Sequence, residues 1–145
     1  MTGMNWPEVV VVDGGKMPER KTAGAAGFDC YARGHTRVLP YGTVKKIPLG
    51  FRIAIPPGHH GAIYLRSSIA LRGDLVAPSV GIVDEDFRGE VCLVVQARGE
   101  GVDIGHGERV CQLVITPSPP MTLVQVSELG ETTRGAGGFG STGAR

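Results

Sequence analysis

Short apolar stretches recur along the chain, and turn-forming residues separate nearly all of them. Phe51, Ile53 and Ile55 alternate with smaller or charged residues, which places one apolar face inward at the two-residue period of a β-strand. Proline and glycine interrupt the chain in residues 40–42 and 56–58, where φ is fixed or turns positive. The pattern predicts strands over residues 9–12, 43–47, 51–55, 62–65, 91–96, 109–116 and 121–126.

One short helix is the only helix that the sequence predicts. It begins at Ser67 or Ser68, whose hydroxyl serves as the N-cap, and covers little beyond residues 69–71 before Gly73. The 23 glycines and 10 prolines, with only 6% aromatic residues, favour many short strands joined by turns. We therefore expect an all-β sandwich or barrel, and 145 residues suffice for one domain with its own core.

The charges are balanced, and no segment is suited to a membrane. Fifteen Lys and Arg against fourteen Asp and Glu leave a net charge of +1, which excludes a general attraction to nucleic acid or anionic lipid. The aliphatic run over residues 9–12 is closed by Asp13, too early for a signal-peptide core or a membrane span. Cys30, Cys92 and Cys111 lack C-x-x-C spacing and indicate buried small hydrophobes in a reducing compartment, with a reactive thiol as the alternative. We expect a cytoplasmic protein.

The C-terminal segment has an unusual composition. Residues 130–145 hold six glycines and one large apolar side chain, Phe139, so burial alone cannot order this segment. The letters GAGGFG match a dinucleotide fingerprint, but that fingerprint needs a preceding strand and a following helix, and the chain ends first. A solvated tail is one interpretation. The other is a phosphate clamp built from Arg134, Ser141 and Thr142, with Phe139 stacked on a flat ring.

Two segments concentrate polar chemistry. Arg66, Ser67 and Ser68 place a guanidinium and two hydroxyls at the start of the predicted helix, which favours a phosphate site, with a helix cap and a surface arginine as the alternative. The stretch GIVDEDFRG carries Asp84 and Asp86. Both point the same way if the strand continues past residue 83, and could then hold a water or a metal, whereas an acidic surface turn is the plainer interpretation.

Single polar residues also occur inside apolar strands. Asp29 in AGFDCYA and Gln112 in ERVCQLV need partners once they are buried, so each satisfies the backbone or serves a ligand. The four histidines lie in turns or beside glycines, without ligand spacing to a cysteine. We expect all four to be solvated.

These segments, in this order and spacing, resemble the five motifs of the trimeric dUTPase family from Met17 to Thr142. The motifs are AGFDCYA, LRSSIA, GIVDEDFRGEV, ERVCQLV and RGAGGFGSTG. The resemblance implies a distorted jelly-roll β-barrel, a homotrimer with a swapped C-terminal arm, and hydrolysis of dUTP to dUMP and pyrophosphate. It divides the chain into a β domain over residues 1–133 and a flexible arm over residues 134–145, which closes a neighbouring subunit's site.

The resemblance also implies a role for each matched residue. Asp84 activates the water that attacks the α-phosphorus, and Mg²⁺ on the phosphates is held through waters by Asp29 and Gln112. The resemblance further implies a set of residues that bind the uracil, sugar and phosphates, and Gln112 belongs to this set as well. They are Arg66, Ser67, Ser68, Gly81, Ile82, Val83, Phe87, Gln112, Arg134, Phe139, Gly140, Ser141 and Thr142.

Two positions depart from the family pattern, and two separate it from a related activity. Phe87 replaces a tyrosine beneath the deoxyribose, so the ring that blocks a 2′-hydroxyl remains without its phenol, and Pro78 replaces an asparagine near the uracil hairpin. The related dCTP deaminases carry an arginine and a catalytic glutamate where this chain has Leu71 and Val94, and without that base water is not activated at C4. Two further hypotheses are a regulatory nucleotide-binding protein and a structural jelly-roll subunit.

Overall fold

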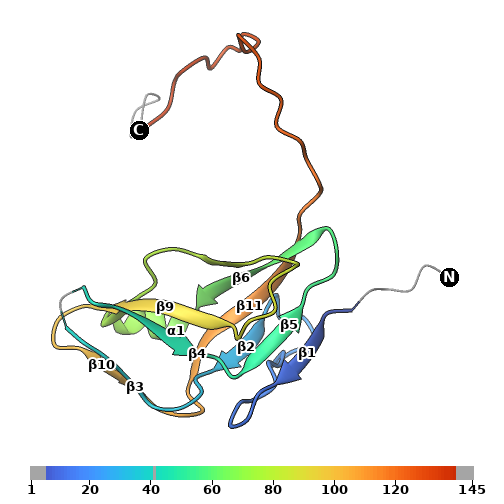
Figure 1. The fold of residues 1–145 in the computed structure, drawn as a ribbon. Helices are drawn as coiled ribbons and strands as arrows, with labels where there is room; N and C mark the ends of the chain where they lie inside the picture. Colours follow the sequence, from blue (N-terminus) through green and yellow to red (C-terminus); the bar gives the residue numbers. More distant parts are fainter. Residues whose placement is uncertain (1–5, 41, 140–145) are drawn as a thin grey trace.

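Antiparallel strands make up almost all regular structure in the computed structural model, which describes residues 6–40 and 42–139 (Figure 1). The one helix within residues 6–40 and 42–139, α1 (Ser67–Arg72), follows the sixth strand. The strands of the described residues are β1 (Glu8–Val11), β2 (Phe28–Tyr31), β3 (Thr36–Val38), β4 (Val44–Pro48), β5 (Phe51–Ala54), β6 (His59–Leu65), β7 (Leu75–Val76), β8 (Gly81–Val83), β9 (Cys92–Ala97), β10 (Val102–Ile104) and β11 (Arg109–Pro117). This is the predicted all-β jelly-roll class with one short helix.

Four small sheets are formed by segments that are mostly distant in sequence. The largest has the order β2-β11-β6-β8, and β4-β9-β7 forms a second sheet. The pairs β1-β5 and β3-β10 complete the described structure. Because β11 is the longest strand and lies between β2 and β6, it places β2 and β8 at opposite edges of the largest sheet.

Alternate side chains of these strands form the core. In β9, Leu93, Val95 and Ala97 are buried while Val94 is exposed, as a period of two requires. Phe51 and Leu113 are among the largest fully buried side chains. No helix among the described residues is long and apolar enough to span a membrane.

Six predicted strands are confirmed, and no end is shifted by more than three residues. They are β1, β4, β5, β6, β9 and β11. Strands β3, β7 and β10 were not predicted, because each has only two or three residues and gives no clear periodicity. The predicted serine cap is wrong: Arg66 occupies the N-cap of α1 with extended angles, and no side chain caps the helix. Gly73 ends α1 at φ 74°, as predicted.

The predicted strand over residues 121–126 is wrong. The chain leaves the body after β11 and extends away from it (Figure 1), so this segment has no neighbouring strand with which to form hydrogen bonds. We call residues 121–129 the strap. Its apolar side chains are 56% to 97% exposed: Met121, Leu123, Val124, Val126 and Leu129.

Candidate functional site

A cavity of about 220 Å³ opens beside β8. It brings together five residues predicted to bind or attack a nucleotide: Gly81, Ile82, Val83, Asp84 and Phe87. The strand itself is fixed by antiparallel pairing with β6, where Val83 lies opposite Gly61. The cavity therefore combines β8 with one aromatic ring and two carboxylates, those of Asp84 and Glu90.

Asp84 stands in a turn rather than in a strand. The strand β8 ends at Val83, and the backbone N–H of Phe87 donates to the carbonyl of Asp84 at 3.1 Å. The conditional prediction that Asp84 and Asp86 share one side of a strand is therefore wrong. Glu85 anchors the turn, because its Oε2 accepts the Gly58 N–H at 2.6 Å. This holds the exposed carboxylate of Asp84 at the cavity rim.

Phe87 packs over a glycine. A Cβ on Gly89 would lie 2.6 Å from Phe87 Cζ, closer than atoms of a rigid ring tolerate. Gly89 is therefore required for this position of the ring, which remains 43% exposed and presents a flat apolar surface to the cavity.

Three polar residues of the cavity wall were missed by the sequence analysis: Lys46, Glu90 and Cys92. Arg33 donates Nε and Nη2 to the two Glu90 oxygens, both at 2.7 Å, and the Gly50 N–H donates to Glu90 Oε1 at 3.0 Å. The Arg33 guanidinium holds the pKa of Glu90 below its ordinary value. The charged Glu90 carboxylate therefore links Arg33 to the backbone at Gly50. Burial raises the pKa of the Cys92 thiol, which keeps it protonated at neutral pH. Sequence spacing gave no signal for these three residues.

A second cluster, of opposite charges, lies on β2 and β11. The Asp29 side chain is 15% exposed and contacts two arginines. Arg109 Nη1 donates to Asp29 Oδ2 at 3.1 Å, and Arg66 Nε lies 3.5 Å from Oδ1. Gln112 pairs directly with Asp29 across the strands. The structure thus brings together three of the predicted site residues, Asp29, Arg66 and Gln112, and places Arg109 beside them.

A β-bulge explains why Arg109 faces this cluster. Arg109 pairs with Tyr31 and Cys111 with Cys30, so Val110 is an extra residue on β11. Val110 and Cys111 are consecutive and both fully buried, which breaks the alternation and turns Arg109 to the Asp29 side. The sequence signal for the position of Arg109 is the pair of adjacent apolar residues Val110 and Cys111 between the polar residues Arg109 and Gln112.

The donors present fit a cation that keeps its own waters. Among the described residues, no group of three His, Cys, Asp or Glu side chains could hold a metal ion. Both oxygens of Asp29 already face arginines, and Gln112 lies beside them. Mg²⁺ sheds water reluctantly and commonly takes direct ligands from polyphosphates. Asp29 and Gln112 therefore suit contact through water. Of the four histidines expected to be solvated, His35 and His106 are exposed, and the other two are half-buried.

The cavity and the charged cluster are far apart within one chain. Val83 lies opposite Gly61, so Asp84 follows near His60, whereas Arg66 follows the other end of β6. About six residues of strand separate His60 from Arg66, or about 20 Å. Ser67 and Ser68 are exposed beside Arg66, and Asp29 lies on the opposite sheet edge from β8. One chain therefore presents two half-sites.

The predicted arm is described only in part. Arg134 Nε donates to the Gly137 carbonyl at 2.8 Å, and Phe139 is fully exposed with φ 51°. Neither residue contacts the cavity or the charged cluster in its own chain. The remaining predicted arm residues, Gly140, Ser141 and Thr142, lie outside the described residues.

Known proteins resemble this chain over most of its length. The dUTPase family model matches residues 13–143. A deoxyuridine 5′-triphosphate nucleotidohydrolase of Methylocella silvestris is 42% identical over 133 residues, covering 88% of this chain and 83% of that protein. The Caulobacter vibrioides protein of the same name is 43% identical over 134 residues, covering 88% and 85%. The structure of the Staphylococcus bacteriophage 80alpha dUTPase with dUPNHPP matches with a TM-score of 0.87 at 25% identity, covering 96% of this chain and 99% of that one. The chain belongs to the dUTPase family.

Proposed function

We propose that this protein hydrolyses dUTP to dUMP and pyrophosphate, which limits uracil in DNA and supplies dUMP for dTMP synthesis. The single observation that carries the proposal is the cavity beside β8, where a carboxylate at the rim adjoins backbone and an aromatic ring. Membership of the dUTPase family and relatives named for this reaction support it.

The cavity accounts for base and sugar selection. We propose that Gly81, Ile82 and Val83 present backbone groups to uracil, in a slot that excludes the thymine methyl group. Phe87 lies beneath the deoxyribose and excludes a 2′-hydroxyl. Val94 lines the same cavity and offers no group for proton transfer, which argues against deamination at this site.

The reaction is an in-line displacement at the α-phosphorus. Asp84 accepts a proton from a water, whose oxygen forms a bond to phosphorus as the bond to the leaving pyrophosphate oxygen breaks. Arg66, Ser67 and Ser68 bind the phosphate oxygens and stabilise the charge that develops on the leaving group. Asp29 and Gln112 would hold Mg²⁺ through water molecules, and the bound ion would neutralise phosphate charge.

We also propose that the working enzyme is a homotrimer with shared sites. A general base must lie within hydrogen-bonding reach of its water, yet Asp84 and Arg66 are separated by about 20 Å along β6. Bringing them onto one nucleotide requires the Asp84 of one subunit and the Arg66 of another. The arm of residues 134–145 would then close a neighbouring site with Arg134, Gly140, Ser141 and Thr142 on the phosphates and Phe139 over the base.

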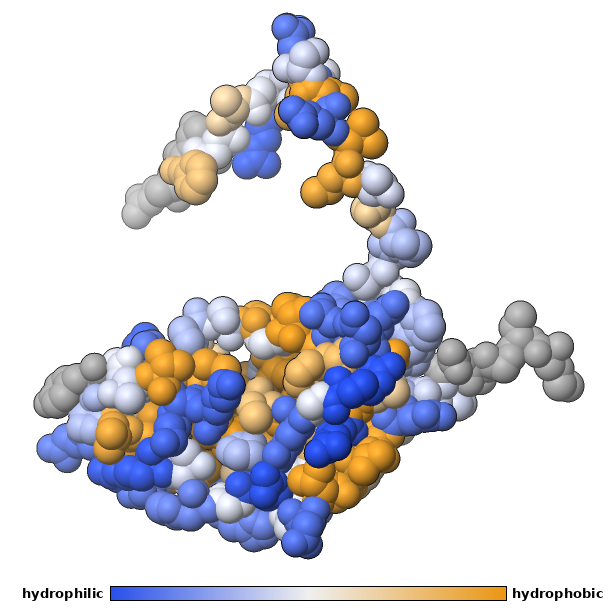
Figure 2. Space-filling model, viewed as in Figure 1, coloured by the Kyte–Doolittle hydropathy of each residue, from blue (hydrophilic) through white to orange (hydrophobic). Residues whose placement is uncertain are grey.

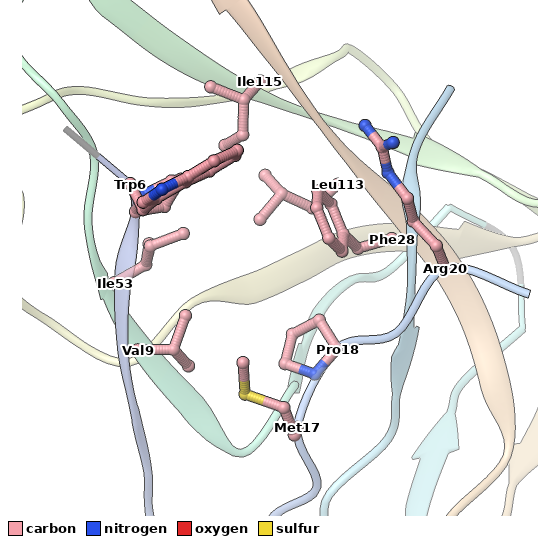
Figure 3. A pocket seen from close by; sticks show the side chains of 10 residues that line it. Trp6, Val9, Met17, Pro18, Arg20, Phe28, Ile53, Leu113 and Ile115 are labelled. Atoms are coloured by element: carbon pink, nitrogen blue, oxygen red, sulfur yellow. The ribbon is translucent and has the colours of Figure 1, made fainter. Parts of the chain in front are cut away.

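The strap supplies a physical reason for assembly. Its exposed apolar side chains (Figure 2) are not covered by residues 6–40 or 42–139 of their own chain. An apolar cavity of about 390 Å³ lies between the N-terminal segment, β5 and β11, and Trp6, Phe28 and Ile115 are among its walls (Figure 3). We propose that the strap of a second copy covers this surface, because burial of both apolar surfaces favours association.

A nucleotide panel tests the proposed activity. Pyrophosphate release is measured from dUTP, dTTP, dCTP and UTP, with Mg²⁺ and with a chelator. We expect dUTP with Mg²⁺ to exceed each other nucleotide by about 100-fold in kcat/KM, since the slot selects on both base and sugar. Similar rates for all four nucleotides would contradict the assigned specificity, and no release from dUTP would contradict the function.

A further inference from the structure

The two arginines on Asp29 are held unequally. Arg109 makes a hydrogen bond of ordinary length, 3.1 Å, to Oδ2. Arg66 Nε approaches Oδ1 only to 3.5 Å, beyond the usual N–H···O range. A second Arg66 nitrogen reaches only the Arg109 carbonyl, at 3.4 Å. Arg109 is therefore the firm partner of the carboxylate, and Arg66 is the partner that leaves at lower cost.

The surroundings of Asp29 make a permanent partner necessary. Its side chain is only 15% exposed, and a carboxylate with so little water loses considerable free energy when it has no cation beside it. If Arg66 were its only partner, transfer of Arg66 to a phosphate would leave the carboxylate uncompensated. The bulge at Val110 prevents this, because it places Arg109 on the same side of the sheet as Asp29.

We propose that Arg109 is a positioning residue that acts through Asp29: as the lasting counter-ion of this carboxylate, it releases Arg66 to bind the phosphates of the nucleotide. The inference rests on the proposed function, which places Arg66 on the phosphates. It assigns Arg109 no contact with substrate. The rival arrangement has Arg109 bind phosphate directly, and the two arrangements predict different behaviour when Asp29 is neutral.

The first measurement compares Arg109→Gln with wild type in steady-state hydrolysis of dUTP. Without Arg109, Asp29 holds Arg66 more tightly, and binding of the triphosphate must break that pair. We expect KM to rise about 10-fold, as for loss of one charged hydrogen bond, while kcat stays within about threefold. Arg109→Lys, which keeps the charge, should restore KM to within about threefold of wild type. An unchanged KM in Arg109→Gln would overturn the proposal.

The second measurement repeats Arg109→Gln in an Asp29→Asn background. With no carboxylate to compensate, Arg109→Gln should alter KM by less than about twofold there. The same 10-fold rise in both backgrounds would show that Arg109 meets phosphate directly and would refute the positioning role. Arg37→Gln is the matched control, because it removes an arginine from an exposed aspartate pair on β3 and β10, and it should leave KM unchanged.

A binding measurement separates this inference from the proposed reaction. Pyrophosphate is titrated calorimetrically into the full chain in the presence of a chelator, so that neither Mg²⁺ nor turnover contributes. We expect Arg109→Gln to weaken pyrophosphate binding about 10-fold in the wild-type background and by less than about twofold with Asp29→Asn. Equal weakening in both backgrounds overturns the role of Arg109. If the weakening depends on Asp29 as expected but the wild-type protein does not hydrolyse dUTP, the proposed function is overturned and the role of Arg109 stands.

Discussion

Mixing two inactive variants should restore activity if subunits share the site. Asp84→Asn removes the proposed base, and Arg66→Gln removes a proposed phosphate contact about 20 Å away in the same chain. Each variant alone should retain less than about 1% of wild-type turnover. In a trimer assembled from both chains, a site works when its carboxylate comes from one variant and its arginine from the other.

The expected recovery follows from the combinatorics of a symmetric trimer. With equal amounts of the two chains and random assembly, a quarter of the sites receive an intact Asp84 and an intact Arg66, so turnover should reach about 25% of wild type. The chains are unfolded together, refolded, and assayed for pyrophosphate release from dUTP. Separately refolded chains, assayed immediately after mixing, provide the baseline.

A second mixture shows how much activity to expect when a site is built from two subunits or from one. Wild-type chain refolded with an equal amount of the double variant should retain about a quarter of wild-type activity when the residues come from different subunits, but about half when they come from one subunit. Absence of recovery in the first mixture, with about half activity in the second, would refute the shared site. The proposed use of Arg66 from a neighbouring subunit would then be abandoned.

Three further outcomes follow from the structure. Asp84→Asn should lower kcat by about 10²- to 10⁴-fold with a modest change in KM, and a loss of threefold or less in steady-state assays would mean that Asp84 is not the base. A chain ending at Thr133 should remain trimeric by light scattering but turn over poorly, and full activity would remove the arm from the mechanism. Glu90→Gln should lower the free energy of unfolding at pH 7 by about 1 kcal/mol in denaturant titrations at fixed protein concentration. Because Arg33 depresses the pKa of Glu90 below the ordinary 4.5, that contribution is complete above pH 4.5 and disappears as the pH falls through the lower folded value. Glu100→Gln, at an exposed position, is the control, and a difference that persisted in strong acid would contradict this origin.

The six confirmed strands each have four or more residues and a paired neighbour within the chain. In β5 and β9, alternate apolar residues are buried on one side, so the period of two is visible in the letters. Strands β3 and β10 pair only with each other, and three residues give no period. The strap has strand-like residues but no neighbour, because β structure depends on a partner that a local pattern does not describe.

The sequence nominated residues for the candidate site but did not indicate how they are arranged. The motifs named Asp84, Phe87, Asp29 and Arg66, and the structure groups the first two and the last two. Their separation along β6 follows from strand register, which sequence spacing does not reveal. Arg109 was missed because regular alternation turns it toward the core, and only the bulge reverses this. The division into residues 1–133 and 134–145 stays a prediction.

The strap has a consequence for synthesis of the protein. A newly made chain carries five large apolar side chains on an extended segment with no cover of its own, and such segments aggregate when they remain exposed. If a second copy covers the strap, as proposed, the time before assembly is the stage at which this chain aggregates most readily. The yield of soluble protein should then depend on how quickly newly made chains associate. Because association is faster at higher chain concentration, the rate of expression affects this yield in addition to the sequence of the β domain.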